Sequence, residues 1–208
     1  MNLELFEAGM TSERTTFAKS LLRKNGGMVF SGEEQKTASL LCNAAIEARV
    51  IGLDKPAMSI TGSGAHGIIA TMPLYAAYKV NGYSKEQLLR ATALSYLICM
   101  YIKEYSGKLS AFCGAVSASC ASAAQSLIYV EEVLHRLKQR LTIHLANIPG
   151  IICDGAKISC AAKIAACLDA AFLAHHLAMN GQSYAPYTGI LQEETAETIS
   201  CVGQIGKD

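Results

Sequence analysis

The sequence has no cluster of basic residues, and its 18 lysines and arginines are nearly balanced by 17 acidic residues. Proteins that bind the phosphate backbone of nucleic acids carry a concentrated positive patch, so nucleic acid is not expected as a partner. The first twenty residues also lack an apolar run of signal-peptide length, because charged residues interrupt them at Glu4, Glu7, Glu13 and Arg14. We therefore expect a cytoplasmic protein.

Cysteine is present, but in neither of its most common structural patterns. Eight cysteines in 208 residues fall below the density of a disulfide-stabilised protein. The sequence has no CxxC pair, so the usual zinc and ferredoxin spacings are absent. In a reducing compartment such cysteines serve as core residues, metal ligands or nucleophiles.

A membrane must be considered, because residues 111–130 carry no charge and are long enough to span one. The segment consists mostly of Ala, Ser, Cys and Gly, whereas helices that face lipid are rich in Leu, Ile and Phe. We therefore expect a buried core helix here and no membrane partner.

Strand signals are scarce and helix signals recur, which predicts an all-α fold. Capping boxes are expected at residues 31–34 and 84–87, ahead of apolar-periodic helices that run to Val50 and to about Lys103. We expect one compact domain over residues 1–208, a bundle of about seven helices without internal repeats or long linkers. The other expected elements are helices over 67–80, 111–145 with a possible break, 156–179 and 193–202, and one short strand over 57–60.

Two further patterns concern turns and packing. The pairs Gly26-Gly27, Asn81-Gly82 and Asn180-Gly181 predict helix stops or turns, because these residues tolerate positive φ. Segments 111–124 and 156–171 are rich in small residues, which let helices approach closely, so we expect them to pair at the centre. That pairing would bring Cys113 near Cys153 and Cys160.

The string IICDGAKISCAAK, residues 151–163, is the most informative part of the chain. Asp154 is a good N-cap, so we expect a helix to begin near Ala156 and to hold Cys160 in its second turn. The positive end of that helix would favour thiolates. Together with Cys113, Cys153 and Cys160 can hold three corners of an iron–sulfur cluster and leave the fourth corner for a substrate.

The alternative is that these cysteines are buried core residues, since free cysteine is among the most buried residue types. From spacing alone, both interpretations of Cys153 and Cys160 stay open. Cys167 continues the interval of seven and is either a rival ligand or part of the same buried face. A structural role is favoured for the five remaining cysteines, which are Cys42, Cys99, Cys120, Cys167 and Cys201.

Three strings in order carry a family resemblance. TGSGAHGI at 61–68, IKEYSGKLSAFCGAV at 102–116 and GIICDGAKISCAAK at 150–163 resemble the L-cysteine desulfidase group of the iron–sulfur L-serine dehydratase α-chain family. A weaker match, GILQEETAETISCVGQIG at 189–206, extends the resemblance over most of the chain. The fold so identified is a serine dehydratase α-chain-like domain.

The resemblance implies a lyase that removes sulfide from L-cysteine, or hydroxide from L-serine, to leave pyruvate and ammonia. L-cysteine is the expected preference. The implied cofactor is a 4Fe-4S cluster held by Cys113, Cys153 and Cys160, with the fourth iron open to act as a Lewis acid on the leaving group.

The resemblance also implies a substrate site at Ser63, Gly64, His66 and Gly67, where a helix start can bind a carboxylate. His66 and Lys103 are the candidate catalytic residues. The alternatives are a hydrogen-bonded turn histidine at His66 and a surface ion pair of Lys103 with its neighbour. Residues for which a structural role is equally or more strongly expected are Glu104, Lys157, Lys163, His175 and His176.

The sequence also departs from the family. Ala65 stands where relatives usually have Asn, and Ala115 where they often have Cys. Family members have a preceding region that contributes to the active site, so the chain resembles their C-terminal α-type domain, a fragment or subunit of a longer architecture. A missing N-terminal domain or a β-type chain is the expected partner, and a homo-oligomer is possible. The alternative function is a non-catalytic helical domain or subunit.

Overall fold

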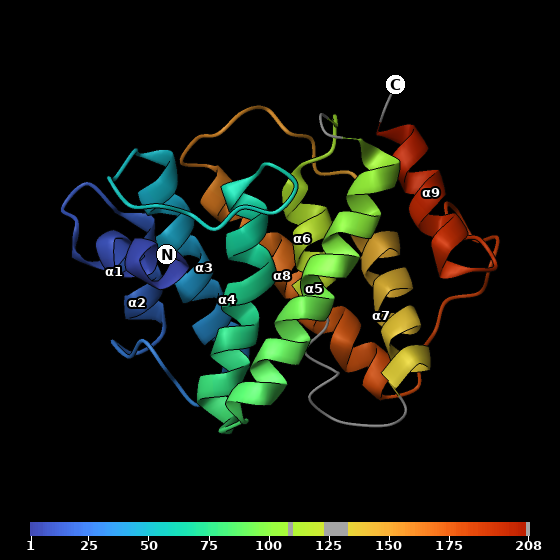
Figure 1. The fold of residues 1–208 in the computed structure, drawn as a ribbon. Coiled ribbons are helices and arrows are strands. Elements are labelled where there is room, and N and C mark those ends of the chain that lie inside the picture. Colours follow the sequence, from blue (N-terminus) through green and yellow to red (C-terminus); the bar gives the residue numbers. More distant parts are fainter. Residues whose placement is uncertain (108–109, 123–132, 207–208) are drawn as a thin grey trace.

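A computed structural model describes residues 1–107, 110–122 and 133–206 (Figure 1). Within these ranges the chain forms nine helices and no strand, which confirms the all-α prediction. The two helices beyond the expected seven lie at the N-terminus. The helices are α1 Asn2–Thr11, α2 Phe17–Lys24, α3 Glu34–Val50, α4 Gly64–Asn81, α5 Lys85–Ser106, α6 Gly114–Ser122, α7 Val133–Asn147, α8 Cys160–Met179 and α9 Thr195–Ile205.

One of the two predicted capping boxes forms. The Ser84 hydroxyl accepts from the backbone N–H of Gln87, and the Gln87 side chain accepts in return from the N–H of Ser84. The box predicted at Ser31 is wrong, because that hydroxyl accepts from the N–H of Glu33, outside the helix, at 3.3 Å. The predicted turn glycines are confirmed by their positive φ at positions 26, 27, 82 and 181.

The loop before α8 differs from the prediction. The helix begins at Cys160, not near Ala156, and Asp154 is not its cap. The Asp154 carboxylate instead pairs with the ammonium groups of Lys157 and Lys163. The short strand expected at 57–60 is also wrong, because Ile60 pairs only with Ser63 across a tight turn that leads into α4.

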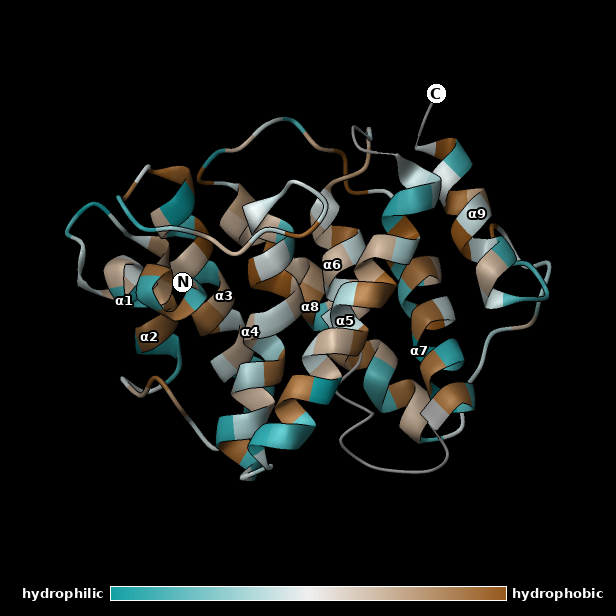
Figure 2. Ribbon diagram, viewed as in Figure 1, coloured by the Kyte–Doolittle hydropathy of each residue, from teal (hydrophilic) through white to brown (hydrophobic). Residues whose placement is uncertain are grey.

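The centre of the bundle is the small-residue pair α6 and α8, as predicted. Every side chain of α6 from Ala115 to Ser122 is buried, and the helix packs against α4, α5, α7 and α8 (Figure 1). The part of the expected helix that covers residues 123–132 lies outside the described residues. In Figure 2 the ribbon of α6 is mostly white to brown, which marks weakly polar to apolar residues.

Among the described helices, α8 alone is long and apolar enough to cross a membrane. A core helix of a soluble protein passes the same test, and α8 packs against α3, α6 and α7.

The loops that precede α4, α6 and α8 gather at one end of the bundle (Figure 1). Two of them are joined by backbone hydrogen bonds. The N–H of Cys113 donates to the carbonyl of Ile151 at 2.7 Å, and the N–H of Cys153 donates to the carbonyl of Ala111 at 2.8 Å. These bonds fix two of the candidate ligands beside each other.

Candidate functional site

A cavity of about 240 Å³ lies where α4, α6 and α8 begin. Cys113, Cys153 and Cys160 all line it. Its polar lining also includes Arg49, Ser63, His66, Lys103 and Ser110. The remaining wall is small or apolar and is formed by Ile46, Val50, Ala65, Ile69, Phe112, Gly114, Ala115, Gly155, Ala156 and Ile164.

Each thiol reaches the cavity from a different piece of backbone. Cys113 directly precedes α6, Cys153 is exposed in the loop before α8, and Cys160 is the first residue of α8. The Cys160 sulfur lies 3.5 Å from the carbonyl oxygen of Gly155, to which it donates, and 3.5 Å from the N–H of Lys157, from which it accepts. The loop is therefore folded around this sulfur.

The three sulfurs are close enough to influence one another's charge. Burial is the main cause that raises the pKa of the Cys113 thiol, and the sulfurs of Cys153 and Cys160 raise it further. The N–H of Ala115 and the ammonium of Lys163 act in the opposite direction. Three thiolates in this space therefore need a positive group to neutralise them.

Within the described ranges, no three His, Cys, Asp or Glu side chains are arranged to hold one metal ion. A single zinc ion needs sulfurs about 2.3 Å from one point. A four-iron cluster is larger and takes each cysteine on a different iron, so thiols spread around one cavity fit it better than they fit a single ion. The donor chemistry of the lining residues suits such a cluster.

The other cysteines do not line this cavity. Cys42, Cys99, Cys120 and Cys167 are buried, and burial raises the pKa of Cys99 and of Cys167 to about 12. Cys201 is half-buried on α9. Cys167, the rival ligand, does not line the cavity that the other three thiols share, although Cys113 is near enough to raise its pKa.

His66 is 6% exposed and lies on the first turn of α4. The Thr61 hydroxyl donates to the carbonyl of Ile60 at 2.7 Å and lies 3.0 Å from Nδ1 of His66. With the hydroxyl proton donated to Ile60, the matching tautomer of His66 has its hydrogen on Nδ1 and a lone pair on Nε2. Burial, then the charges of Lys103 and Arg49, lower the pKa of His66 to about 4, so the ring is neutral at pH 7.

Lys103 reaches the same cavity from α5 and is 8% exposed. Burial lowers the pKa of its ammonium, which Cys99 and Cys153 partly oppose. The ion pair considered with Glu104 is not formed, since Glu104 is exposed and no salt bridge joins it to Lys103 in the described part of the chain.

Arg49 was missed by the sequence analysis. It lies on the last turn of α3 and lines the cavity, where a methyl group added to Gly64 would come within 2.9 Å of its Nε. The sequence offers only a cation at the end of an apolar helix, and tertiary packing alone brings it to the start of α4.

The residues of the TGSGAHGI string have different environments. Ser63 is the N-cap of α4, makes no side-chain capping bond and lines the cavity. Gly64 packs against Arg49 and Ala57, whereas a side chain on Gly67 would overlap the carbonyl of Met58. These two glycines allow close packing and do not line the cavity.

The remaining candidates lie at the edge of the site or away from it. Lys163 donates to the carbonyl of Ile152 at 3.0 Å and pairs with Asp154, as does Lys157, so both lysines hold the cysteine loop. On α8, His175 is half-buried and His176 is exposed, and neither lines the cavity.

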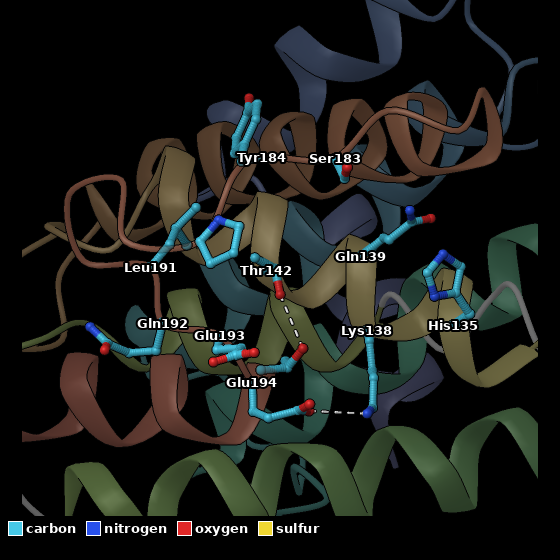
Figure 3. A pocket seen from close by; sticks show the side chains of 12 residues that line it. His135, Lys138, Gln139, Thr142, Ser183, Tyr184, Leu191, Gln192, Glu193 and Glu194 are labelled. Carbon is cyan, nitrogen blue, oxygen red and sulfur yellow. Dashed lines mark hydrogen bonds and ion pairs between the residues drawn. The ribbon is translucent and has the colours of Figure 1, made fainter.

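A second cavity, of about 260 Å³, lies between α7 and the loop that leads to α9 (Figure 3). Four of its polar groups already bond to one another: Lys138 and Glu194 pair at 3.2 Å, and the hydroxyls of Thr142 and Thr195 lie 3.1 Å apart. It contains no cysteine. The cysteine-lined cavity is therefore the stronger candidate.

Comparison with known proteins gives relatives of greater length. A UPF0597 protein of Clostridium botulinum is 36% identical over 206 residues, which are 99% of this chain and 47% of that protein. A UPF0597 protein of Treponema denticola is 35% identical, over 98% of this chain and 48% of that protein. The L-cysteine desulfidase of Methanocaldococcus jannaschii is 38% identical over 174 residues, 83% of this chain and 42% of that protein.

The chain thus spans about half the length of the curated relatives it matches. No solved structure matches it. The family model described as serine dehydratase alpha chain matches residues 1–208, which confirms the resemblance carried by the sequence strings. This chain belongs to the serine dehydratase alpha-chain family.

Proposed function

We propose that this chain is the cluster-binding part of a lyase that removes the β-substituent of a small L-amino acid, L-cysteine in preference to L-serine. The observation that carries the proposal is the single cavity shared by Cys113, Cys153, Cys160 and His66. The family match and the L-cysteine desulfidase relative support the reaction class.

Cys113, Cys153 and Cys160 are the residues that would hold a 4Fe-4S cluster. Such a cluster, with one iron not bound by protein, supplies a Lewis acid for the leaving sulfur or oxygen. The three helix starts around the cavity place partial positive charge near these thiolates, which favours an anionic group there.

The protein residues supply the proton transfer and the binding. Nε2 of His66 has a lone pair and accepts the α-proton of the substrate, while the electron pair of that bond forms the new double bond and the β-substituent leaves with its own electrons. Hydrolysis of the resulting enamine gives pyruvate and ammonia. Lys103 holds the substrate as a buried cation, and Ile46, Ile69 and Ile164 keep water from the reacting carbon.

We propose that a partner, either a preceding domain or a β-type chain, completes this site. The relatives are about twice as long as the region that matches this chain. The proposal also expects a reducing cytoplasm, since an iron open to substrate is open to oxygen.

The test is an assay of the protein purified without oxygen from its own cells, together with any chain that copurifies. Sulfide release from L-cysteine is compared with pyruvate formation from L-serine, before and after exposure to air. We expect faster turnover of L-cysteine and loss of activity in air. A preference for serine would overturn the substrate choice, and no turnover of either amino acid would favour a non-catalytic helical subunit.

A further inference from the structure

Apart from its three thiols, the cysteine-lined cavity has cationic side chains but no acidic ones within the described ranges. Two cationic side chains, Arg49 and Lys103, face it from α3 and α5. No Asp or Glu is among the described residues that line it. The start of α4 also lines the cavity, through Ser63, Ala65 and His66. The first backbone N–H groups of a helix have no partner within the helix, so this helix start adds partial positive charge.

The positive charge of Lys103 lies inside the cavity and not on the outer surface of the protein. The side chain is more than nine-tenths buried, and in the described part of the chain its ammonium has no hydrogen bond and no ion pair with a carboxylate. The Lys103 ammonium lines the cavity without a carboxylate partner among the residues described, so the cavity suits an anionic occupant.

Arg49 favours an occupant that carries a carboxylate group. The guanidinium of arginine is a planar fork that matches the two oxygens of a carboxylate. No salt bridge or side-chain hydrogen bond of Arg49 is seen among the described residues, and its Nε lies beside Gly64 at the start of α4. Both cations also act on His66, whose pKa they lower after the larger effect of burial.

We propose that Arg49 and Lys103 form the anchor for the α-carboxylate of the substrate, with Arg49 as its specificity-determining residue. This rests on the proposed function and deepens it. With the carboxylate held by the two cations, the rest of a small amino acid shares the cavity with His66 and the three thiols. The site then selects small free amino acids and rejects esters, amides and amines that lack a carboxylate.

The experiment measures binding, so that it does not depend on turnover or on iron. Propionate has the carboxylate but neither the ammonium nor a leaving group, and propionamide has the same shape without the charge. Binding of each to the purified chain is followed by ligand-observed NMR. We expect propionate to bind at least about tenfold more tightly than propionamide.

Substitutions of Arg49 test whether this residue causes the preference for propionate. Arg49→Gln is expected to weaken propionate binding about tenfold or more, and Arg49→Lys to recover part of the loss. Arg90→Gln is the matched control, because Arg90 is exposed on α5 and pairs with Glu86 on the surface. Circular dichroism and urea midpoints verify that each variant is folded.

The proposal is overturned if propionate does not bind, if propionamide binds equally well, or if Arg49→Gln binds propionate as tightly as the unmodified chain does. Should these binding results hold while the protein takes up no iron and turns over no amino acid, only the proposed function fails. The two conclusions can therefore be separated.

Discussion

The imidazole of His66 lies directly against the α-carbon of Gly114, the residue after Cys113, and a side chain at position 114 would overlap Nε2. The helix starts of α4 and α6 can approach this closely only because position 114 has no Cβ. This contact brings the proposed base and a proposed cluster ligand to one cavity.

Gly114→Ala is therefore expected to push the His66 ring out of place. We expect turnover to fall about 100-fold, the lower end of what a general base contributes, and the free energy of unfolding to fall by about 1–3 kcal/mol. Gly150→Ala is the control, because an added methyl group there meets nothing within 4 Å. Equal activity of the two variants would show that the position of His66 does not matter for the reaction.

Glu47 is expected to be essential for the N-terminal helices. Its buried carboxylate accepts hydrogen bonds from the backbone N–H groups of Thr16 at 2.7 Å, Phe17 at 3.0 Å and Ala18 at 2.8 Å, and so caps α2 from α3. Glu47→Gln should lower the free energy of unfolding by about 1–3 kcal/mol in urea titrations. The exposed control Glu7→Gln should change it by less than about 0.5 kcal/mol. Similar midpoints for both would contradict this role.

Stability is expected to fall in mild acid because of a buried histidine. Burial lowers the pKa of His144 on α7 to about 4, with Arg140 adding to the effect, and its Nε2 lies 3.1 Å from the Ser119 hydroxyl. Between pH 4 and about 6.5 the unfolded chain binds a proton that the folded chain does not, so the free energy of unfolding rises with pH across this window. The loss on acidification is on the order of 3 kcal/mol.

Urea titrations at several pH values test this, using His144→Gln and the exposed control His135→Gln. In His144→Gln the free energy of unfolding should depend less on pH between pH 4 and 6.5 than it does in the unmodified chain. In His135→Gln this dependence should stay the same. Burial also lowers the pKa values of His66 and His175 to about 4, so these two histidines leave part of the slope in both variants. An unchanged slope in His144→Gln would rule out this histidine as a source.

Asp154 is expected to stabilise the loop that carries Cys153, without contributing to the stability of the whole fold. Its exposed carboxylate pairs with Lys157 and Lys163, which lowers the pKa of the carboxyl group to about 2. Asp154→Asn should reduce the iron retained after gel filtration, while the urea midpoint stays unchanged because the pairs are on the surface. The exposed Asp54→Asn is the control. Full iron retention in Asp154→Asn would show that the loop needs no such support.

The parts of the fold that were predictable are those with local causes. The box of Ser84 and Gln87 forms because both partners lie within one turn of the chain. Helix α2 gave no such signal, since its cap is the side chain of Glu47, which lies about thirty residues further along. The sequence predicts Asp154 as the N-cap of α8, but its carboxylate forms ion pairs with Lys157 and Lys163. The helix therefore begins later, at Cys160.

The same distinction applies to the site. Cys113, Cys153, Cys160, Ser63, His66 and Lys103 were candidates from the sequence, and the structure places all six on one cavity. Gly64 and Gly67 were candidates too, but they serve close packing of α4 against Arg49 and Met58. Arg49 could not be recognised, because its position depends on how α3 crosses the start of α4.

The binding of a cluster by Cys113, Cys153 and Cys160 is tested most directly by the iron and acid-labile sulfide content of the chain after reconstitution without oxygen. We expect a brown protein with about four irons and four sulfides per chain, as one 4Fe-4S cluster requires. Cys113→Ser, Cys153→Ser and Cys160→Ser should each lose most of both, whereas Cys201→Ser should keep them. A colourless unmodified chain, or full cluster content in Cys153→Ser, would contradict the assignment.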